Sequence, residues 1–552
     1  MGRVPGYLVT RILHKVVIIL HRSNRHYLCG FQGVLKVSVT NKKKASSPQF
    51  PLRLAGIDIG SNAIRLLVAE FDSLGNYQMI ASDRMPVRLG HGVFVSGKLR
   101  DNAIDAAISA LGQFKDCCEQ HGVHALRIVA TSAVREADNE EDFCDRVKSE
   151  LGLDIEVISG SEEAILIHTA IRSKVLMGRS RWISIDVGGG SVEVSLVDSE
   201  GIILSESHPI GSVRLLEELS EIGNEDRRFK KLLAEYISNL KLPIAAQRYR
   251  PAGIIATGGN IETLAKIANN QSGHEITSIT LSSLRSTIEA ISKLSYKQRM
   301  EQLGLKKDRA DVILPGAMVY EKISTLAGAN EIIVPFVGVR DGIVIDLFDK
   351  TTSSSDNVIR QTNQLNSSCL TLGRKFFFDE LHALQVQFLS LSIFDQLHEH
   401  LNLDNSDRHI ISAASLLHDI GCFISEKRHH KHSYYIVVNS EILGLDYKEL
   451  QLVASIVRFH RKSEPNIRHF EFASLPEEDQ YRLVRFTGIL RLADSLDREH
   501  MQRVKSIIIE NSNDQLRLYI EANGELLLEK WSFTKKSQML SKLLEKQIVI
   551  VN

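Results

Sequence analysis

Cysteine is scarce in this sequence, and its few cysteines form no pattern that is typical of a metal site or a disulfide framework. The chain has 552 residues, and its cysteines are Cys29, Cys117, Cys118, Cys144, Cys369 and Cys422. Zinc fingers and small disulfide-stabilised domains need paired cysteines at short, repeated spacings. The sequence is atypical of both classes, and a reducing cytoplasm is the expected location.

An excess of either charge is also missing, as are long apolar runs. The 67 lysines and arginines balance 67 aspartates and glutamates. A basic excess over the whole chain is typical of nucleic-acid binders, so no sequence-specific nucleic-acid partner is expected. The apolar run Val16–Leu20 is far shorter than the roughly 20 residues that span a bilayer, and it is short for a signal-peptide core. We therefore expect no membrane span.

Acidic residues are absent from the first fifty positions, which nevertheless carry the basic run Lys42-Lys43-Lys44. The segment 1–51 is predicted to be a basic extension without fixed structure. A tail that contacts a polyanion or a membrane surface, or a start codon placed too far upstream, are the alternatives. The sequence assigns this segment no function.

A glycine turn at the centre of the chain is the first feature that points to chemistry. The apolar strand Trp182–Asp186 runs into Gly188-Gly189-Gly190 and out again into the strand Val192–Val197. Successive glycines allow close approach and positive φ, so that backbone N–H groups can converge on an anion. A carboxylate beside a phosphate needs a bridging hard cation such as Mg²⁺. A plain hairpin with glycine at its turn is the alternative.

Two further turns of the same kind favour the phosphate-binding interpretation. Asp58-Ile-Gly60-Ser61-Asn62 lies between the predicted strands Ala55–Asp58 and Leu66–Phe71. Thr257-Gly258-Gly259 ends another predicted strand and opens a helix, whose N-terminus can bind an anion. Two similar α/β halves whose phosphate turns face each other imply a cleft between them.

Five motifs in a fixed order carry a resemblance to a known family. The chain resembles the actin-like superfamily and, more narrowly, the exopolyphosphatase and guanosine pentaphosphate phosphatase family, over roughly residues 52 to 510. Nothing in the sequence suggests a sugar-binding insert or an adenine pocket, which disfavours the sugar kinases of that superfamily. The motifs are Asp58 to Asn62, Ala130-Thr-Ser-Ala-Val-Arg135, Ile158-Ser-Gly160-Ser-Glu162-Glu163-Ala164, Asp186 to Glu193, and Val337-Gly-Val-Arg340-Asp-Gly342.

The resemblance and the length together predict several domains, because 552 residues exceed what one core usually supports. The expected fold is α/β, with two actin-like (ribonuclease H-like) domains at 52–179 and 180–350. An all-α domain of the HD type is expected at 351–503 and a small α+β segment at 504–552. The polar stretch Thr351–Asn357 is predicted to be a linker.

Local patterns give the expected elements. Alternating polar and apolar residues predict strands at Gln78–Ala81 and Arg127–Ala130. A helix is predicted over Asn102–His121, and another over Glu162–Ser173 with Ser161 as its N-cap. Strands are expected in the last segment at Val504–Ile509, Leu516–Ile520, Glu525–Lys530 and Ile548–Val551.

The resemblance also implies roles for individual residues. Glu163 matches the family's catalytic carboxylate, which orients and deprotonates the attacking water, and Arg135 matches a phosphate-binding arginine. From the residues alone, Glu163 could equally be an acid that complements a helix dipole, and Arg135 a solvated side chain. Asp186 would hold Mg²⁺, with Glu193 and Asp58 as further candidates. The candidate phosphate-binding residues are Ser61, Asn62, Arg135, Gly188, Gly189, Gly190, Ser191, Gly258 and Gly259.

The helical region contains a second set of metal-ligand residue types. His382, the pair His418-Asp419, and Asp494 follow the order typical of HD-type metal-dependent phosphohydrolases, and imidazole with carboxylate suits a divalent metal. His432 and His460 are candidates for a second metal position. The alternative is a non-catalytic helical cap that shapes a substrate channel. Basic residues that could line such a channel include Lys427, Arg428, Lys431, Arg458, Arg461, Lys462, Arg482, Arg485 and Arg491.

The combined expectation is a cytoplasmic, Mg²⁺-dependent phosphoanhydride hydrolase that removes terminal phosphate from inorganic polyphosphate. The alternative within the same chemistry is hydrolysis of the 5′ γ-phosphate of guanosine pentaphosphate. An alternative of another class is a non-catalytic alarmone or polyphosphate sensor in which Glu163 is idle. The resemblance implies a homodimer.

Overall fold

The computed structural model describes residues 50–199, 201–219, 227–242, 251–269, 276–352, 355–512 and 514–551. The predicted basic extension 1–51 lies outside the described residues except for its last two positions. Within the described ranges, no helix has both the length and the apolar character needed to cross a membrane.

The first half is built around a five-stranded sheet with the order β3-β2-β1-β4-β5. Strands β1 and β2 are antiparallel, whereas β4 runs parallel to β1. The helices α3 (Asp101–Gln120) and α5 (Glu140–Leu151) pack on the sheet through a shared apolar core, so the predicted first helix is confirmed. The strands are β1 (Leu52–Ile59), β2 (Ile64–Phe71), β3 (Tyr77–Met85), β4 (Ala125–Ala130) and β5 (Glu156–Val157).

The second half repeats this plan with a six-stranded sheet of order β10-β11-β9-β6-β7-β8. Its core includes the helices α10 (Gly259–Asn269), α11 (Leu281–Ser292) and α14 (Ile313–Ala327). The sequence pattern predicted four of the six strands; β8 and β10 are rich in serine and threonine or only half-buried, so their apolar signal is weak. The strands are β6 (Trp182–Val187), β7 (Val192–Val197), β8 (Ile202–His208), β9 (Ile254–Thr257), β10 (Thr277–Thr280) and β11 (Glu331–Val334).

The two halves share one hairpin geometry. In the first half, the N–H of Gly60 donates to the carbonyl of Ala63, and in the second the N–H of Gly188 donates to that of Ser191. The same register places Asp58 opposite Arg65 and Asp186 opposite Glu193. The predicted pair of similar α/β halves is therefore confirmed.

Two helices join the halves. Apolar side chains of α6 (Gly160–Arg172) and α15 (Val339–Thr352) form one buried cluster with residues of both sheets. Gly342 of α15 lies so close to α6 that a Cβ atom would come within 2.0 Å of the Leu166 carbonyl oxygen. Only glycine permits this contact, which explains the glycine of the fifth motif.

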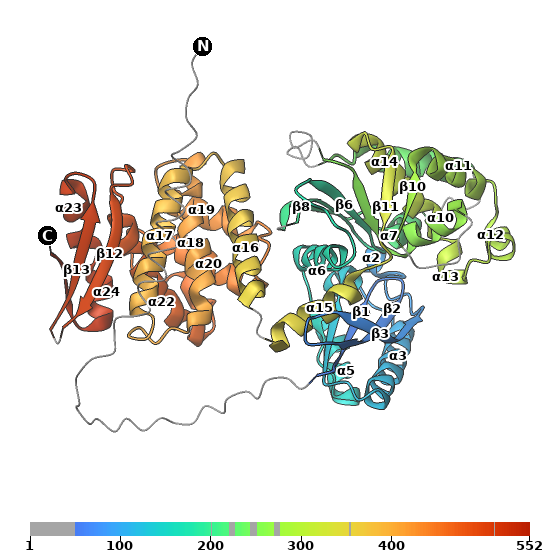
Figure 1. Cartoon of the computed structure of the whole chain (residues 1–552), viewed down its shortest axis with the longest axis horizontal. Coiled ribbons are helices and arrows are strands. Elements are labelled where there is room, and N and C mark those ends of the chain that lie inside the picture. Colours follow the sequence, from blue (N-terminus) through green and yellow to red (C-terminus); the bar gives the residue numbers. More distant parts are fainter. Residues whose placement is uncertain are drawn as a thin grey trace, which may run out of the picture. The chain divides into compact units, whose positions relative to one another are not determined.

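The remaining chain forms a helical region that ends in a three-stranded sheet, β12-β13-β14 (Figure 1). Side chains of the helices and of this sheet belong to a single hydrophobic cluster, so the last segment has its core in common with the helices. The principal elements are α16 (Ser355–Lys375), α17 (Glu380–Leu397), α18 (Arg408–Leu417), α19 (His429–Val438), α20 (Tyr447–Phe459), α22 (Glu477–Ser495), β12 (Val504–Asn511), β13 (Gln515–Ala522), α23 (Leu527–Lys536), α24 (Gln538–Leu544) and β14 (Gln547–Val551).

Two local predictions in this part of the chain are wrong. The polar stretch Thr351–Asn357 is mostly helical, because α15 continues to Thr352 and α16 begins at Ser355; residues 353 and 354 lie outside the described residues. The predicted strand Glu525–Lys530 is not formed, because helix α23 begins at Leu527; it buries Glu529, Ser532 and Phe533, which recur at helical spacing. This pattern of buried residues favours a helix, although the short apolar run in the sequence had suggested a strand.

The helical region also contacts the second half and the start of α6. The Gln364 side chain accepts a hydrogen bond from the N–H of Ile202 (2.6 Å) and donates one to its carbonyl (2.8 Å). Near the start of α6, Ser161 Oγ donates to Glu441 Oε2 at 3.0 Å. The edge strand β8 is thus covered by α16 rather than left open.

Candidate active site

Three buried carboxylates from different elements meet between the two halves. Asp186 stands near the end of β6, Glu193 lies opposite it on β7, and Glu163 is in the first turn of α6. One oxygen from each lies within 4.8 Å of the others, and all three side chains are buried. We call Glu163, Asp186 and Glu193 the carboxylate cluster.

Local sequence fixes where α6 begins and therefore where Glu163 lies. Ser159 caps the helix by accepting the N–H of Glu162 at 3.1 Å, and Glu162 Oε2 accepts the N–H of Ser159 at 3.0 Å. This reciprocal capping box makes Glu162 a cap of α6. The predicted cap Ser161 is wrong, because the helix starts earlier, at Gly160.

Burial and mutual repulsion make the carboxylate cluster unfavourable when all three groups are ionised. Burial, followed by the nearby charge of Glu193, raises the pKa of Glu163 well above its usual value. Burial raises the pKa of Asp186 to about 6, and burial with the charge of Asp186 raises the pKa of Glu193 to about 7. Two like charges at this separation repel by about 3.5 kcal/mol at an effective dielectric constant of about 20.

Only some oxygen atoms of the carboxylate cluster accept hydrogen bonds. Thr257 Oγ1 donates to Asp186 Oδ1 at 2.5 Å, and Ser207 Oγ donates to Glu193 Oε1 at 3.1 Å. Glu163 Oε2 and Glu193 Oε2 are buried and have no hydrogen-bond partner among the described residues. Unpaired carboxylate oxygens in a compact buried group are the donor set that a hard divalent cation prefers.

The glycine turn beside the carboxylate cluster is required by close packing. A Cβ atom on Gly189 would lie 2.6 Å from Ser61 Cβ, and one on Gly190 would lie 2.5 Å from Ser132 Oγ. The turn of the second half thus packs directly against the turn of the first, where Ser61 and Ser132 hydroxyls lie 3.0 Å apart. The prediction that these glycines adopt positive φ is wrong for Gly188–Gly190. Gly258, in the third glycine turn, does adopt it, with φ +100°.

The other predicted site residues lie around these turns with partners of their own. Arg135 Nη1 donates to the carbonyl of Ile158 at 2.6 Å and lies 3.9 Å from Glu163 Oε2. Asn62 Nδ2 donates to the carbonyl of Asp308 at 2.8 Å. Asp58, whose partner the sequence did not reveal, pairs with Arg65 at 2.9 Å and is not one of the three converging carboxylates.

Sequence reasoning missed a group of arginines near the third glycine turn. Arg309 lies against Gly259, where a Cβ atom would come within 2.3 Å of its Nη2, and its Nη1 donates to Asn260 Oδ1 at 2.7 Å. Burial, then the charges of Arg84 and Arg65, lowers the Arg309 pKa to about 10. The only signal for Arg309 is a short charged stretch, which ordinarily indicates a solvated surface.

The histidine-rich part of the helical region also converges, with one change from the prediction. His382 Nε2 lies 3.3 Å from His418 Nε2 and 3.6 Å from Asp494 Oδ1, and His418 Nε2 lies 3.7 Å from Asp419 Oδ1. The second group that could hold a cation is Asp419, His429 and His460, so His429 occupies the place predicted for His432. The structure therefore brings together the histidine cluster: His382, His418, Asp419, His429, His460 and Asp494.

The pKa shifts of three rings in the histidine cluster differ in direction. Burial opposes charge on His382, but contacts with Asp494 and Asp497 raise its pKa to about 10. Burial lowers the pKa of His418 to about 4. Burial likewise opposes charge on His429, but Asp419 raises its pKa to about 9. The shifts on His382 and His429 are thus opposite in direction to the shift on His418.

Four of the basic residues considered for a substrate channel are used inside the helical region. Arg458 pairs with Glu471 at 3.0 Å, and Arg482 pairs with Asp407 and Asp479. Arg485 donates to a backbone carbonyl at 2.7 Å, as does Arg491 at 2.8 Å. Fewer basic side chains are therefore available to line a substrate channel than the sequence suggested.

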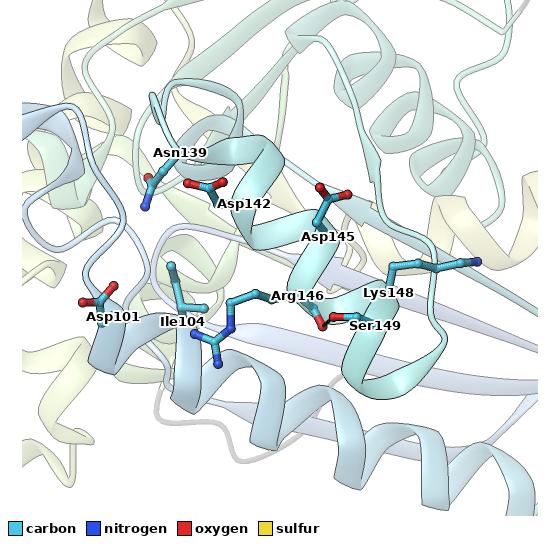
Figure 2. A pocket seen from close by; sticks show the side chains of 8 residues that line it. All are labelled: Asp101, Ile104, Asn139, Asp142, Asp145, Arg146, Lys148 and Ser149. Atoms are coloured by element: carbon cyan, nitrogen blue, oxygen red, sulfur yellow. Dashed lines mark hydrogen bonds between the residues drawn. The ribbon is translucent and has the colours of Figure 1, made fainter.

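An open hollow between α3 and α5 belongs to neither cluster (Figure 2). Arg146 crosses it and pairs with Asp105 and Glu150, both at 3.0 Å. These exposed ion pairs contribute little to stability, and nothing about the hollow points to catalysis. Its lining residues are Asp101, Ile104, Asn139, Asp142, Asp145, Arg146, Lys148 and Ser149.

Comparison with known proteins relates this architecture to named relatives. Exopolyphosphatase 1 of Mycobacterium tuberculosis is 28% identical over 329 residues, which cover 58% of this chain and 95% of the relative. Exopolyphosphatase 1 of Mycobacterium leprae is 29% identical over 306 residues, covering 54% and 90%. The crystal structure of an exopolyphosphatase from Cytophaga hutchinsonii, 24% identical, superimposes with a TM-score of 0.51 over 55% of this chain and 99% of that chain, which supports the predicted actin-like fold.

Family models cover both the α/β halves and the helical region. Residues 67–351 match the model of the Ppx/GppA phosphatase family. Residues 365–539 match the model of Ppx/GppA phosphatase, domain III. The first match includes the whole carboxylate cluster, and it alone spans more than half of the 552 residues. The chain belongs to the Ppx/GppA phosphatase family.

Proposed function

We propose that this chain hydrolyses the terminal phosphoanhydride bond of inorganic polyphosphate at the carboxylate cluster. The observation that carries the proposal is the convergence of three buried carboxylates, two with an unpaired oxygen, beside a tightly packed glycine turn. The curated relatives named exopolyphosphatase 1, which this chain covers over nine-tenths or more of their length, support polyphosphate as the substrate. The chain is thus an exopolyphosphatase-type phosphoanhydride hydrolase.

Glu163 is the general base in this proposal. Its Oε2 has no hydrogen-bond partner among the described residues, so it can accept a proton from a water molecule held beside it. The water oxygen attacks the terminal phosphorus, the bridging P–O bond breaks, and the shortened chain leaves with the bridging oxygen. The raised pKa of Glu163 suits a group that must take up a proton during the reaction.

Asp186 and Glu193 would hold the divalent cation, which we propose to be Mg²⁺. Each keeps one carboxylate oxygen hydrogen-bonded to a hydroxyl group, which orients the carboxylate. When bound, the cation supplies positive charge that offsets the repulsion between the carboxylates and the substrate phosphates. Asp58 is the weaker candidate ligand, because Arg65 already neutralises it.

The phosphate chain would be held by groups that surround the carboxylate cluster. Arg135 is placed to contact a phosphate oxygen, because its guanidinium lies beside Glu163 and is only partly committed to the Ile158 carbonyl. Arg309 adds a cation at the third glycine turn. The remaining candidate contacts are Ser61, Asn62, Gly188, Gly189, Gly190, Ser191, Gly258 and Gly259.

The substrate assignment is tested by assaying phosphate release from long-chain polyphosphate and from guanosine pentaphosphate with one preparation of the protein. We expect faster release from polyphosphate. Faster release from guanosine pentaphosphate would replace the proposal with the second activity. Binding of either compound without phosphate release would identify a non-catalytic sensor.

Replacing Arg135 is expected to weaken substrate binding more than turnover. A charge-assisted hydrogen bond contributes about 1.5–3 kcal/mol, so Arg135→Ala should raise KM for polyphosphate roughly ten- to a hundredfold. Arg135→Lys keeps the charge but loses the planar fork, and it should recover only part of the affinity. Initial-rate measurements over a range of polyphosphate concentrations separate KM from kcat. A change confined to kcat would contradict a role in binding.

Several finer statements belong to the same proposal. The domain boundaries 52–179, 180–350, 351–503 and 504–552, a homodimer and a cytoplasmic location remain predictions. The five cysteines within the described residues are free thiols, which supports a reducing compartment.

A second divalent cation bound by His382, His418, Asp419 and Asp494 is likewise proposed, because these groups lie within 4 Å of their neighbours.

A further inference from the structure

The short helix α7 (Ser212–Glu218) packs against the central glycine turn, Gly188–Gly190. Each carbonyl oxygen of this turn accepts a hydrogen bond from an N–H group at the start of α7 or from the residue before it. All three carbonyl groups are therefore directed towards the helix. The donors are Ser212 to Gly188 (3.0 Å), Val213 and Arg214 to Gly189 (2.8 and 3.0 Å), and Gly211 to Gly190 (3.1 Å).

This contact decides where the N–H groups of the turn point. A trans peptide group is planar, so its C=O and N–H are directed to opposite sides. The N–H groups of Gly189, Gly190 and Ser191 therefore point away from α7. No acceptor for these three groups is found among the described residues. They are available to a phosphate oxygen, as a nest of backbone donors requires.

Arg214 is the side chain that connects this arrangement to the first half. It is 8% exposed, and its Nε donates to the carbonyl of Gly190 at 2.8 Å. Its Nη2 donates to both carboxylate oxygens of Glu136, at 2.7 and 2.6 Å. The guanidinium carbon lies 4.1 Å from the centroid of the Phe94 ring, a cation–π contact. One planar group thus contacts the glycine turn and two residues of the first half.

Both of these first-half partners lie beside groups that the proposed function uses. Glu136 directly follows Arg135 in the chain. Phe94 packs so closely on the glycine turn that a Cβ atom on Gly190 would overlap its ring. Arg214 therefore joins the turn of one half to the neighbourhood of the phosphate-binding arginine of the other.

We infer that Arg214 is a positioning residue for phosphate binding: it fixes the Gly190 peptide and, through Glu136, the place of Arg135. The backbone donors of the glycine turn and the Arg135 guanidinium then meet the same phosphate chain from opposite halves. The inference rests on the proposed function, because that function places the phosphate chain at this turn. A misplacement of about 1 Å can cost on the order of a hundredfold in rate, so a side chain that touches no substrate can still control turnover.

Arg214→Ala removes all three contacts at once. We expect kcat for polyphosphate to fall on the order of ten- to a hundredfold, while thermal unfolding shows that the protein is folded at the assay temperature. Ethylguanidinium carries the same planar group, so adding it far below the concentrations that unfold proteins should restore much of the activity. Ethylammonium supplies the charge without the planar fork and should not. The matched control is Arg146→Ala, which removes an exposed arginine of α5 and should keep full activity.

Glu136→Gln tests the same link without changing a buried residue, because the Glu136 side chain is 40% exposed. It weakens the contact to Glu136 but leaves the contact to Gly190, so kcat should fall less than in Arg214→Ala. The double variant should be no slower than Arg214→Ala alone, because both changes break one link. Glu141→Gln, an exposed acid in the first turn of α5, makes the same change of charge and is the control. Losses that multiply in the double variant would overturn the link between the halves.

Binding of tripolyphosphate to the Glu163→Gln protein, measured by titration calorimetry, gives a readout that needs no turnover. In this background we expect Arg214→Ala to weaken binding roughly tenfold, the effect of about one lost hydrogen bond, and ethylguanidinium to restore it. If the unsubstituted protein released no phosphate from polyphosphate, the proposed function would fail, and this binding measurement would decide the inference alone. Unchanged kcat and unchanged tripolyphosphate affinity in folded Arg214→Ala would overturn the positioning role and leave the proposed function standing.

Discussion

Glu163→Gln is expected to lower turnover of long-chain polyphosphate by on the order of a hundredfold or more, which is the contribution typical of a positioned general base. Glutamine has nearly the same shape as glutamate but cannot take up a proton. The substitution also removes one charge from the buried carboxylate cluster, so folding and polyphosphate binding should be retained. The loss should therefore appear in kcat and not in KM.

The neighbouring residue in the same helical turn provides the control for this experiment. Glu162 caps α6 through its side chain, and glutamine can make the same capping contact. Glu162→Gln should therefore keep nearly full activity. Near wild-type turnover in Glu163→Gln would show that Glu163 is not the base, whatever the behaviour of the control.

Asp186→Asn is expected to produce the second large effect, a loss of activity together with a weaker response to Mg²⁺. The neutral amide keeps one oxygen atom but removes the charge that attracts a hard cation. Titration of activity with Mg²⁺ should show a midpoint shifted to a higher concentration, with a lower plateau. An unchanged midpoint would assign Asp186 a structural role.

Asp58→Asn is the informative comparison, because Asp58 occupies the corresponding position of the first hairpin. It is already paired with Arg65, so its loss should leave the Mg²⁺ midpoint near that of the unsubstituted protein. A shift as large as that of Asp186→Asn would place a cation ligand in both hairpins.

Hairpin features were the most predictable part of the site. Once a glycine turn is recognised, the antiparallel register decides which residues face each other, so Asp186 and Glu193 could be paired from their spacing alone. Glu163 could be singled out only by resemblance, because acids in a first helical turn are common for electrostatic reasons. Its approach to the hairpin depends on tertiary packing that no local pattern encodes.

Errors arose where a helix boundary decided which side chain faces a site. The cap of α6 is Ser159 rather than Ser161, and this shift of two residues was invisible because both serines are good caps. In the helical region, α19 starts at His429 after Arg428 adopts a left-handed conformation with φ 64°. That start turns His429, and not His432, towards Asp419. Arg309 was missed for a related reason, since long-range packing buries it.

The two matching hairpins differ in how the negative charge of their aspartate is balanced. The first half carries a counter-ion of its own, because the residue opposite Asp58 is an arginine. The second half has a glutamate at the matching place, where the proposed function would have a bound cation balance the charge. The two hairpins thus share one backbone geometry but differ in charge at the residue opposite the aspartate. If the proposed function holds, the charge of the first hairpin is balanced by the protein alone, whereas that of the second depends on the supply of a cation.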